Sequence, residues 1–227
     1  MSSIDPDLLL RAYAIGVFPM ADSRDAREVF WVEPKRRAIM PLDGFRMSRS
    51  LRKTIRSGTF EVTRDQAFAD VLRRCSEREE TWINAQIEAG FNRLHRLGHA
   101  HSIECWHNGE LAGGLYGVKL GGAFFGESMF SARADASKVA LAWLVARLTL
   151  GGFSLLDCQF MTEHLRSLGA VEMLQSDYVT VLSSALAGGV AGPPEFGALE
   201  RFLASPAASG PGTSPGCVIA QLLGHTS

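Results

Sequence analysis

The spacing of apolar positions predicts one short helix and then extended chain at the start of this sequence. Asp5, with a proline directly after it, is typical of a helix start, because aspartate caps the first turn and proline fits the first helical position. Apolar residues then recur at helical spacing until Gly16 ends the pattern. Three prolines interrupt residues 18–41, so we expect extended or turn structure there, with short strands at 29–32 and 36–40.

Further along the chain, helical and strand periods alternate. Three consecutive strands are predicted between residues 101 and 130, because Asn108-Gly109 and Gly121-Gly122 are typical hairpin turns between apolar runs. Further strands are expected at 59–62 and 153–159. The helical period predicts helices at 47–57, 67–75, 84–97, 137–150 and 163–168.

An antiparallel meander followed by helix, strand and helix is the plan of the acetyltransferase-like (GNAT) fold, by analogy. We therefore predict an α+β protein with a small N-terminal lobe at 1–45 and an acetyltransferase-like catalytic domain at 46–186. The usual acyl-CoA pyrophosphate loop is missing, so the donor is not expected to be acyl-CoA. After Ala187 the chain is rich in Gly, Ala, Pro and Ser. We expect this tail, 187–227, to be poorly ordered apart from a short helix near 196–204.

Composition narrows the class further. The chain has 227 residues, 46% of them hydrophobic, and a formal net charge of −1, so no overall positive charge indicates nucleic-acid binding. Residues 31–56 nevertheless hold eight basic residues against two acidic ones. This patch indicates either phosphate binding or an ordinary solvated surface. It comprises Lys35, Arg36, Arg37, Arg46, Arg49, Arg52, Lys53 and Arg56.

The cysteines and the lack of long apolar runs point to the cytoplasm. None of the four cysteines forms a CxxC pair, and the N-terminus does not read as a secretory signal, so free thiols in a reducing compartment are expected. No apolar run reaches the roughly 18 residues of a membrane span. The histidines near residue 100 match no zinc spacing, so we predict neither a metal site nor a cofactor. We expect a monomer.

Two groups of polar residues carry candidate chemistry. Glu127 lies in a run of glycines and aromatics, where an unpaired carboxylate is costly, so it must be neutral, paired or functional. Asp157 and Gln159 sit two apart on a predicted buried strand and should share one face. They form either a structural hydrogen-bonded pair or a polar wall that holds a nucleophile. Trp31 and Trp82, in polar contexts, are either core residues or stacking platforms for a base.

Together, these runs resemble the leucyl/phenylalanyl-tRNA–protein transferase family, over roughly residues 7–182. The most specific are GESMFS at 126–131 and DCQF at 157–160, supported by FWVEPKRRAIMP at 30–41 and TWIN at 81–84. The resemblance implies transfer of Leu, Phe or Met from aminoacyl-tRNA to the N-terminal amine of proteins that begin with Arg or Lys. It implies that the new N-terminus marks the protein for degradation.

The resemblance also implies roles for individual residues. Gln159, oriented by Asp157, would accept a hydrogen bond from the amine, and Glu127 would hold the acceptor's cation or fix the network. An apolar pocket would be formed by Phe124, Phe125, Met129, Phe130 and Leu144. Trp31 and Trp82 would pack around the terminal adenosine or the pocket entrance. The tRNA phosphates would be gripped by Lys35, Arg36, Arg37, Arg49, Arg52 and Lys53.

Three other functions remain open on the residues alone. An acyl-CoA-dependent N-acetyltransferase of the same fold is disfavoured by the missing pyrophosphate loop. A cell-wall aminoacyltransferase also uses charged tRNA, but such proteins are larger. A non-catalytic RNA-binding module would keep its whole function when Gln159 is replaced.

Overall fold

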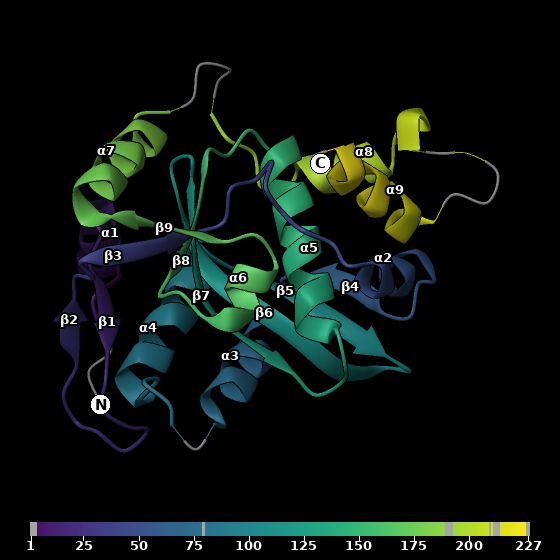
Figure 1. The fold of residues 1–227 in the computed structure, drawn as a ribbon. Helices are drawn as coiled ribbons and strands as arrows, with labels where there is room; N and C mark the ends of the chain where they lie inside the picture. Colours follow the sequence, from purple (N-terminus) through teal and green to yellow (C-terminus); the bar gives the residue numbers. More distant parts are fainter. Residues whose placement is uncertain (1–3, 79, 189–192, 209, 211–213, 226–227) are drawn as a thin grey trace.

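A seven-stranded mixed sheet runs through the centre of the computed structural model, which describes residues 4–78, 80–188, 193–208, 210 and 214–225 (Figure 1). Its strand order is β4-β5-β6-β7-β8-β3-β9, and all neighbours pair antiparallel except β7 and β8, which are parallel. The strands are β3 (Arg36–Ile39), β4 (Glu61–Arg64), β5 (Ala100–His107), β6 (Glu110–Leu120), β7 (Ala123–Ser131), β8 (Leu155–Gln159) and β9 (Val171–Leu174). A separate two-stranded sheet pairs β1 (Phe18–Met20) with β2 (Phe30–Val32).

Helices cover both faces of the sheet. One face packs against α2 (Arg49–Arg56), α5 (Ala136–Leu150), α6 (Glu163–Ser167), α8 (Ala198–Leu203) and α9 (Pro215–Leu222). The other packs against α1 (Pro6–Ala14), α3 (Phe68–Ser76), α4 (Ala85–Arg96) and α7 (Gln175–Leu186). Two short 3-10 helices, Pro206–Ala208 and Leu223–His225, lie in the C-terminal part.

Two buried apolar cores result, one on each side of the sheet. Successive side chains of a strand point to opposite faces, and Phe124 and Leu156 accordingly lie in the α5-side core, whereas Phe125 and Leu155 lie in the other. The meander β5-β6-β7 followed by α5, β8 and α6 is the order that the sequence predicts. The predicted α+β class is therefore confirmed.

The N-terminal part contributes directly to the main sheet. β3 lies between β8 and β9, so residues 36–39 of the predicted N-terminal lobe belong to the same sheet as the predicted catalytic domain. The division at residue 45 stays a prediction. β9 and α7 lie between the predicted helices at 163–168 and near 196–204, and the sequence analysis predicted neither of them.

The described part of the C-terminal tail is more ordered than its composition suggests. α8 and α9 pack on the α5-side core, where Leu199 and Ile219 are fully buried. Ser214 caps α9 and a proline follows it, so this helix has a regular start inside a Gly/Pro-rich stretch. The expectation of a poorly ordered tail is corrected for these residues. Its residues 189–192, 209, 211–213 and 226–227 lie outside the described part.

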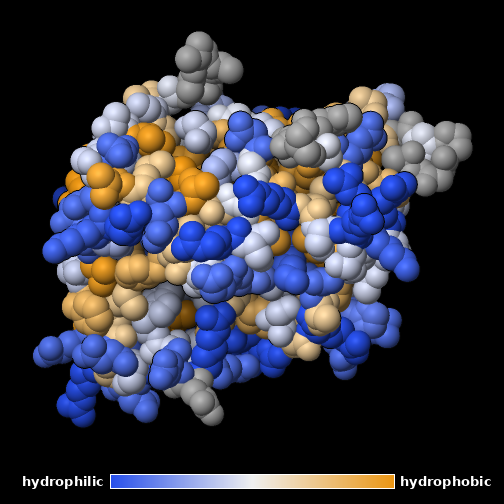
Figure 2. Space-filling view, in the orientation of Figure 1, coloured by the Kyte–Doolittle hydropathy of each residue, from blue (hydrophilic) through white to orange (hydrophobic). Residues whose placement is uncertain are grey.

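Most of the face seen in Figure 2 is hydrophilic, but hydrophobic surface gathers on its left flank, over α7 and neighbouring strands. β9 and α7 carry large exposed apolar side chains, namely Val171, Leu174 and Val179. Among the described residues, no helix is long and apolar enough to cross a membrane.

Candidate active site

Glu127 is placed by a β-bulge in β7. Tyr116 pairs with Ser128 and Gly117 with Gly126, so Glu127 is the extra residue on its strand. Bulges re-aim side chains and change the alternation of faces. Phe125 and Phe130 are five residues apart, which strict alternation would put on opposite faces, yet both lie in the same core.

Glu127 is 8% exposed, and only one of its carboxyl oxygens has partners among the described residues. Oε1 accepts hydrogen bonds from the Tyr13 hydroxyl at 2.7 Å and from the Gln159 side-chain amide at 2.8 Å. Oε2 is buried without a partner among the described residues. Burial raises the pKa of Glu127 to about 7, although the two hydrogen bonds act in the opposite direction. The group therefore titrates near neutral pH.

Asp157 belongs to a buried ion pair that fixes the end of β8. Its carboxylate is fully buried and accepts hydrogen bonds from the Arg37 guanidinium, the closest at 2.6 Å, and from the Tyr178 hydroxyl at 2.7 Å. The guanidinium also donates to the Gly16 carbonyl at 2.9 Å. Because the two groups face each other with several hydrogen bonds, the cost of burying them is offset.

Gln159 has a left-handed backbone, with φ of 60°. Such a conformation is uncommon for a residue other than glycine and often occurs at functional sites. The Asp157 carboxylate accepts the Gln159 backbone N–H at 2.8 Å and so supports this conformation. Asp157 thus binds the backbone of Gln159. The sequence analysis had instead suggested that Asp157 orients the side-chain amide of Gln159. The side chain instead donates to Glu127, and its own carbonyl oxygen has no donor among the described residues.

A cavity of about 390 Å³, which we call the Glu127 cavity, opens beside these groups. Glu127 and Gln159 line it together with Tyr116, whose hydroxyl is buried without a partner among the described residues. Trp82 and Phe160 also line it. Its apolar wall is formed by Leu115, Met129, Leu141, Leu144, Leu156 and Leu165. An apolar pocket with a few convergent polar groups is the usual form of a small-molecule site.

Only part of the predicted pocket wall lines this cavity. Met129, Leu144 and Trp82 do, as the sequence suggested. Phe124 and Phe125 are fully buried instead, one in each core, because neighbouring residues of a strand point to opposite faces. Neither phenylalanine lines the cavity. Trp31 lies on β2, 39% exposed, outside the residues that line it.

The predicted phosphate-binding patch is divided in the structure. Arg37 is 1% exposed and paired with Asp157, which corrects its assignment to a phosphate-binding surface. Lys35 and Arg36 are exposed at the start of β3, whereas the other three predicted residues, Arg49, Arg52 and Lys53, lie on α2. Figure 1 shows β3 and α2 on opposite sides of the molecule, so these residues do not form one surface.

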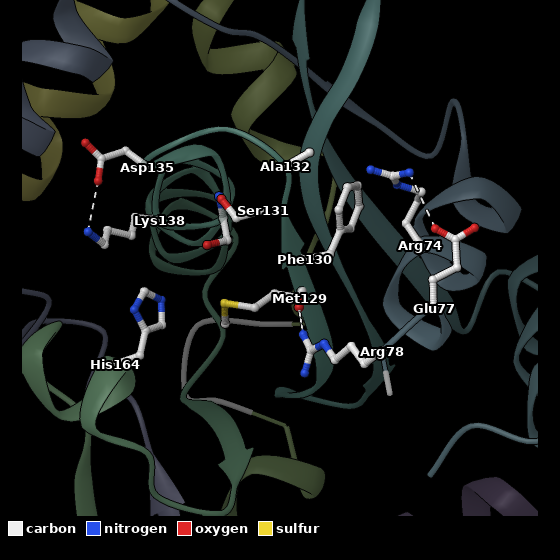
Figure 3. Close-up of a pocket in the computed structure, with 11 residues that line it drawn as sticks. Arg74, Glu77, Arg78, Met129, Phe130, Ser131, Ala132, Asp135, Lys138 and His164 are labelled. Atoms are coloured by element: carbon white, nitrogen blue, oxygen red, sulfur yellow. Dashed lines mark hydrogen bonds and ion pairs between the residues drawn. The ribbon is translucent and has the colours of Figure 1, made fainter. Parts of the chain in front are cut away.

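A second cavity of about 630 Å³, which we call the α5 cavity, lies at the N-terminal end of α5. It shares Arg78, Met129 and His164 with the Glu127 cavity, so the two are adjacent. Figure 3 shows Lys138 and His164 on one side of it and Arg74 on the other, with Met129 and Arg78 between them. Phe130, predicted for the apolar pocket, lines this second cavity.

Sequence reasoning missed the basic residues of the α5 cavity. Arg74 and Arg78 lie four residues apart in a segment with no excess of positive charge, and only folding brings the distant Lys138 to them. The described residues contain no group of three or more His, Cys, Asp or Glu side chains that could hold a metal ion.

Two sequence models of one protein family together match most of the chain. The sequence model of the leucyl/phenylalanyl-tRNA protein transferase family matches residues 39–183, and that of its N-terminal domain matches residues 2–35. A leucyl/phenylalanyl-tRNA–protein transferase of Rhizorhabdus wittichii is 60% identical over 250 aligned residues, which cover 100% of each chain. One of Novosphingobium aromaticivorans is 52% identical over 256 aligned residues, covering 99% of this chain and 97% of that protein.

Similarity to solved structures is distant. L-PGS from Bacillus licheniformis aligns with a TM-score of 0.39 and 14% identity, over 69% of this chain and 53% of that chain. A GCN5-related N-acetyltransferase-like protein from Streptococcus suis aligns with a TM-score of 0.31 and 15% identity, over 73% and 65% of the two chains. The fold description therefore rests on the strand order given above.

Proposed function

Because the chain belongs to the leucyl/phenylalanyl-tRNA–protein transferase family and is an aminoacyltransferase, we propose that it moves Leu, Phe or Met from aminoacyl-tRNA to proteins that begin with Arg or Lys. The acceptor atom is the N-terminal α-amine, and the product marks the protein for degradation. The observation that carries this proposal is the mainly apolar Glu127 cavity, which Glu127 and Gln159 line.

The donor's side chain fits the apolar wall of the Glu127 cavity. Leu, Phe and Met are unbranched at Cβ, and a pocket built mainly from leucines selects among such side chains by shape. A single methylene changes binding by only about 1–3 kcal/mol, so exclusion of Ile and Val needs steric conflict at the β-carbon. Leu144, 1% exposed on α5, is a wall residue where such a conflict can be tested.

The free carbonyl oxygen of Gln159 accepts a hydrogen bond from the attacking amine. This contact aims the nitrogen lone pair at the ester carbonyl of the donor, and positioning of this kind supplies a large part of the acceleration in such reactions. An α-amine has a pKa of about 7.7–8.0, so a substantial neutral fraction exists at neutral pH without a strong base. Glu127 holds the Gln159 amide in place through the bond at 2.8 Å.

The chemical step exchanges an ester for an amide. The amine nitrogen bonds to the ester carbonyl carbon, and the bond from that carbon to the ribose oxygen of the terminal adenosine breaks. The amine proton passes to the ribose oxygen or to water, because an amide side chain is too weakly basic to keep it. Glu127 Oε2 and the Tyr116 hydroxyl, both without protein partners among the described residues, are available to the amino groups of the two substrates.

The direct test is transfer of radiolabelled leucine from leucyl-tRNA to a peptide that starts with Arg, beside the same peptide starting with Ala. Label on the Arg peptide alone is expected. Label on neither, with the charged tRNA intact, would contradict the proposal, and acetyl-CoA would then be tried as donor.

Substitution of Gln159 separates catalysis from RNA binding. Gln159→Ala should lower kcat roughly 100-fold, because the amine is no longer aimed. The matched control is Gln221→Ala, at an exposed glutamine of α9, which should keep wild-type transfer. A non-catalytic RNA-binding module would instead be unaffected by either change.

A further inference from the structure

The α5 cavity has a polar lining that the proposed chemistry does not use. Two of its three strongly basic side chains have acidic partners: Arg74 lies 3.4 Å from Glu77, and Lys138 lies 2.9 Å from Asp135. Arg78 has no carboxylate partner among the described residues and donates only to the Met129 carbonyl. A guanidinium has five N–H donors, so Arg78 has donors to spare for a ligand.

Ser137 adds an unused hydroxyl at the same place. It lines the cavity, is 7% exposed, and its Oγ has no hydrogen-bond partner among the described residues. Its backbone N–H lies in the first turn of α5 and donates to the Ser131 hydroxyl at 3.2 Å. The Ser137 Oγ is not itself a fully buried atom, so it is accessible and can donate a hydrogen bond to a ligand in the cavity.

These features favour an anion over a cation. Both acids of the cavity are already engaged: Glu77 by Arg73 and Arg74, and Asp135 by Lys138. A cationic ligand would need a free carboxylate, which the described lining lacks. An anion instead meets the spare donors of Arg78, the Ser137 hydroxyl and the positive end of a 15-residue helix.

We propose that the α5 cavity binds the phosphodiester that joins the terminal adenosine of the donor to the preceding nucleotide. This inference rests on the proposed function, which puts the aminoacyl ester in the Glu127 cavity. The two cavities share the wall formed by Arg78, Met129 and His164, so the chain of the donor passes directly from one into the other. Arg78 and Ser137 hold the phosphate together with Lys138, whose ammonium has donors left beside its bond to Asp135. These contacts bind the nucleic-acid backbone and do not read the base.

The test compares two small donors that differ by one phosphate. Leucyl-adenosine carries no phosphodiester, and the leucyl ester of the dinucleotide CpA carries one. Arg78 lines both cavities, so replacing it would not distinguish an effect on one cavity from an effect on the other. The variants are therefore Ser137→Ala and Lys138→Gln, which change only the α5 cavity. Each should raise KM for the dinucleotide donor about tenfold more than KM for leucyl-adenosine, the size expected for one lost hydrogen bond to a charged group.

Two controls accompany this comparison. Arg96→Gln removes an exposed cation of α4 outside both cavities and should leave both KM values unchanged. In the wild type alone, a rise of salt from 50 to 200 mM should raise KM for the dinucleotide donor more than that for leucyl-adenosine, since only the former has a phosphate to screen.

Several outcomes would overturn the inference. Equal KM changes for both donors in both variants, or no change for either donor, would show that the cavity does not bind the phosphate. A KM change confined to the acceptor peptide would assign the cavity to the acceptor. Wild-type protein that transfers leucine from neither small donor nor leucyl-tRNA would refute the proposed function itself. Transfer with unshifted KM ratios would refute only the phosphate site.

Discussion

Glu127→Gln removes a buried ionisable carboxyl while keeping its shape. The amide oxygen of the new side chain can still accept from Tyr13 and Gln159, so the hydrogen bonds at Oε1 are retained. The variant loses only the ionisable proton. In the wild type, burial raises the pKa of this group from its ordinary value of 4.5 to about 7. The variant therefore isolates the coupling between this proton and folding.

The sign follows from which state binds the proton. Between pH 4.5 and 7 the unfolded chain has lost the Glu127 proton while the folded protein keeps it, so stability falls as pH rises. The stabilisation is full below pH 4.5 and is lost as pH passes through about 7. A shift from 4.5 to about 7 corresponds to about 3 kcal/mol in total, and most of it falls between pH 5 and pH 8.

Urea unfolding of both proteins at pH 5, 6, 7 and 8 measures this difference. The free energy of unfolding of the wild type should fall by about 2–3 kcal/mol more than that of Glu127→Gln over this range. Equal m-values would show that the comparison reports stability. A difference that stays within about 0.5 kcal/mol at all four pH values would refute the argument that burial governs Glu127. Tyr13→Phe, which removes a bond favouring the ionised form, should move the same transition to higher pH.

Three further substitutions test the frame of the site. Arg37→Met leaves Asp157 buried without its cation and should cost about 3–5 kcal/mol by urea unfolding, while adding Asp157→Asn should restore part of the loss. Gly117→Ala would place a methyl group 2.3 Å from the Phe125 carbonyl oxygen, so a Tm lowered by roughly 10 °C or more is expected by calorimetry. Leu144→Ala enlarges the cavity wall and should raise kcat/KM for phenylalanyl-tRNA relative to leucyl-tRNA roughly tenfold; an unchanged ratio would exclude Leu144 from the pocket.

Local patterns predicted most of the elements well. The apolar run predicted a helix at 137–150, and α5 spans Ala136–Leu150; the predicted strand at 153–159 contains β8, Leu155–Gln159. These elements were predictable because helical and strand periods follow from backbone geometry within a few residues. The turns at Asn108-Gly109 and Gly121-Gly122 were also predictable from neighbouring residues. Gly109 and Gly121 have the positive φ that such turns require.

Other features depended on partners far along the chain. Arg37 stands in a run of basic residues and so resembled surface, but its partner Asp157 lies 120 residues away. The pairing of β6 with β7 created the bulge, so the faces of Phe124, Phe125 and Phe130 could not be read from alternation alone. The Gly/Pro-rich composition likewise did not predict α9. This helix is buried only because it packs against the α5-side core.

The sequence by itself determined the order of helices and strands and the residue types of a polar centre in an apolar environment, since these depend on neighbours within a turn or two. Only the tertiary structure decided which of these polar side chains contact one another. Glu127 meets Gln159 across 32 residues and Tyr13 across 114. The contact depends on a bulge formed by strand pairing and on the left-handed Gln159, whose backbone N–H donates to the Asp157 carboxylate. Long-range pairing also placed Arg78 and Lys138 around one cavity, because contacts between distant segments arise from packing and leave no periodic trace in the chain.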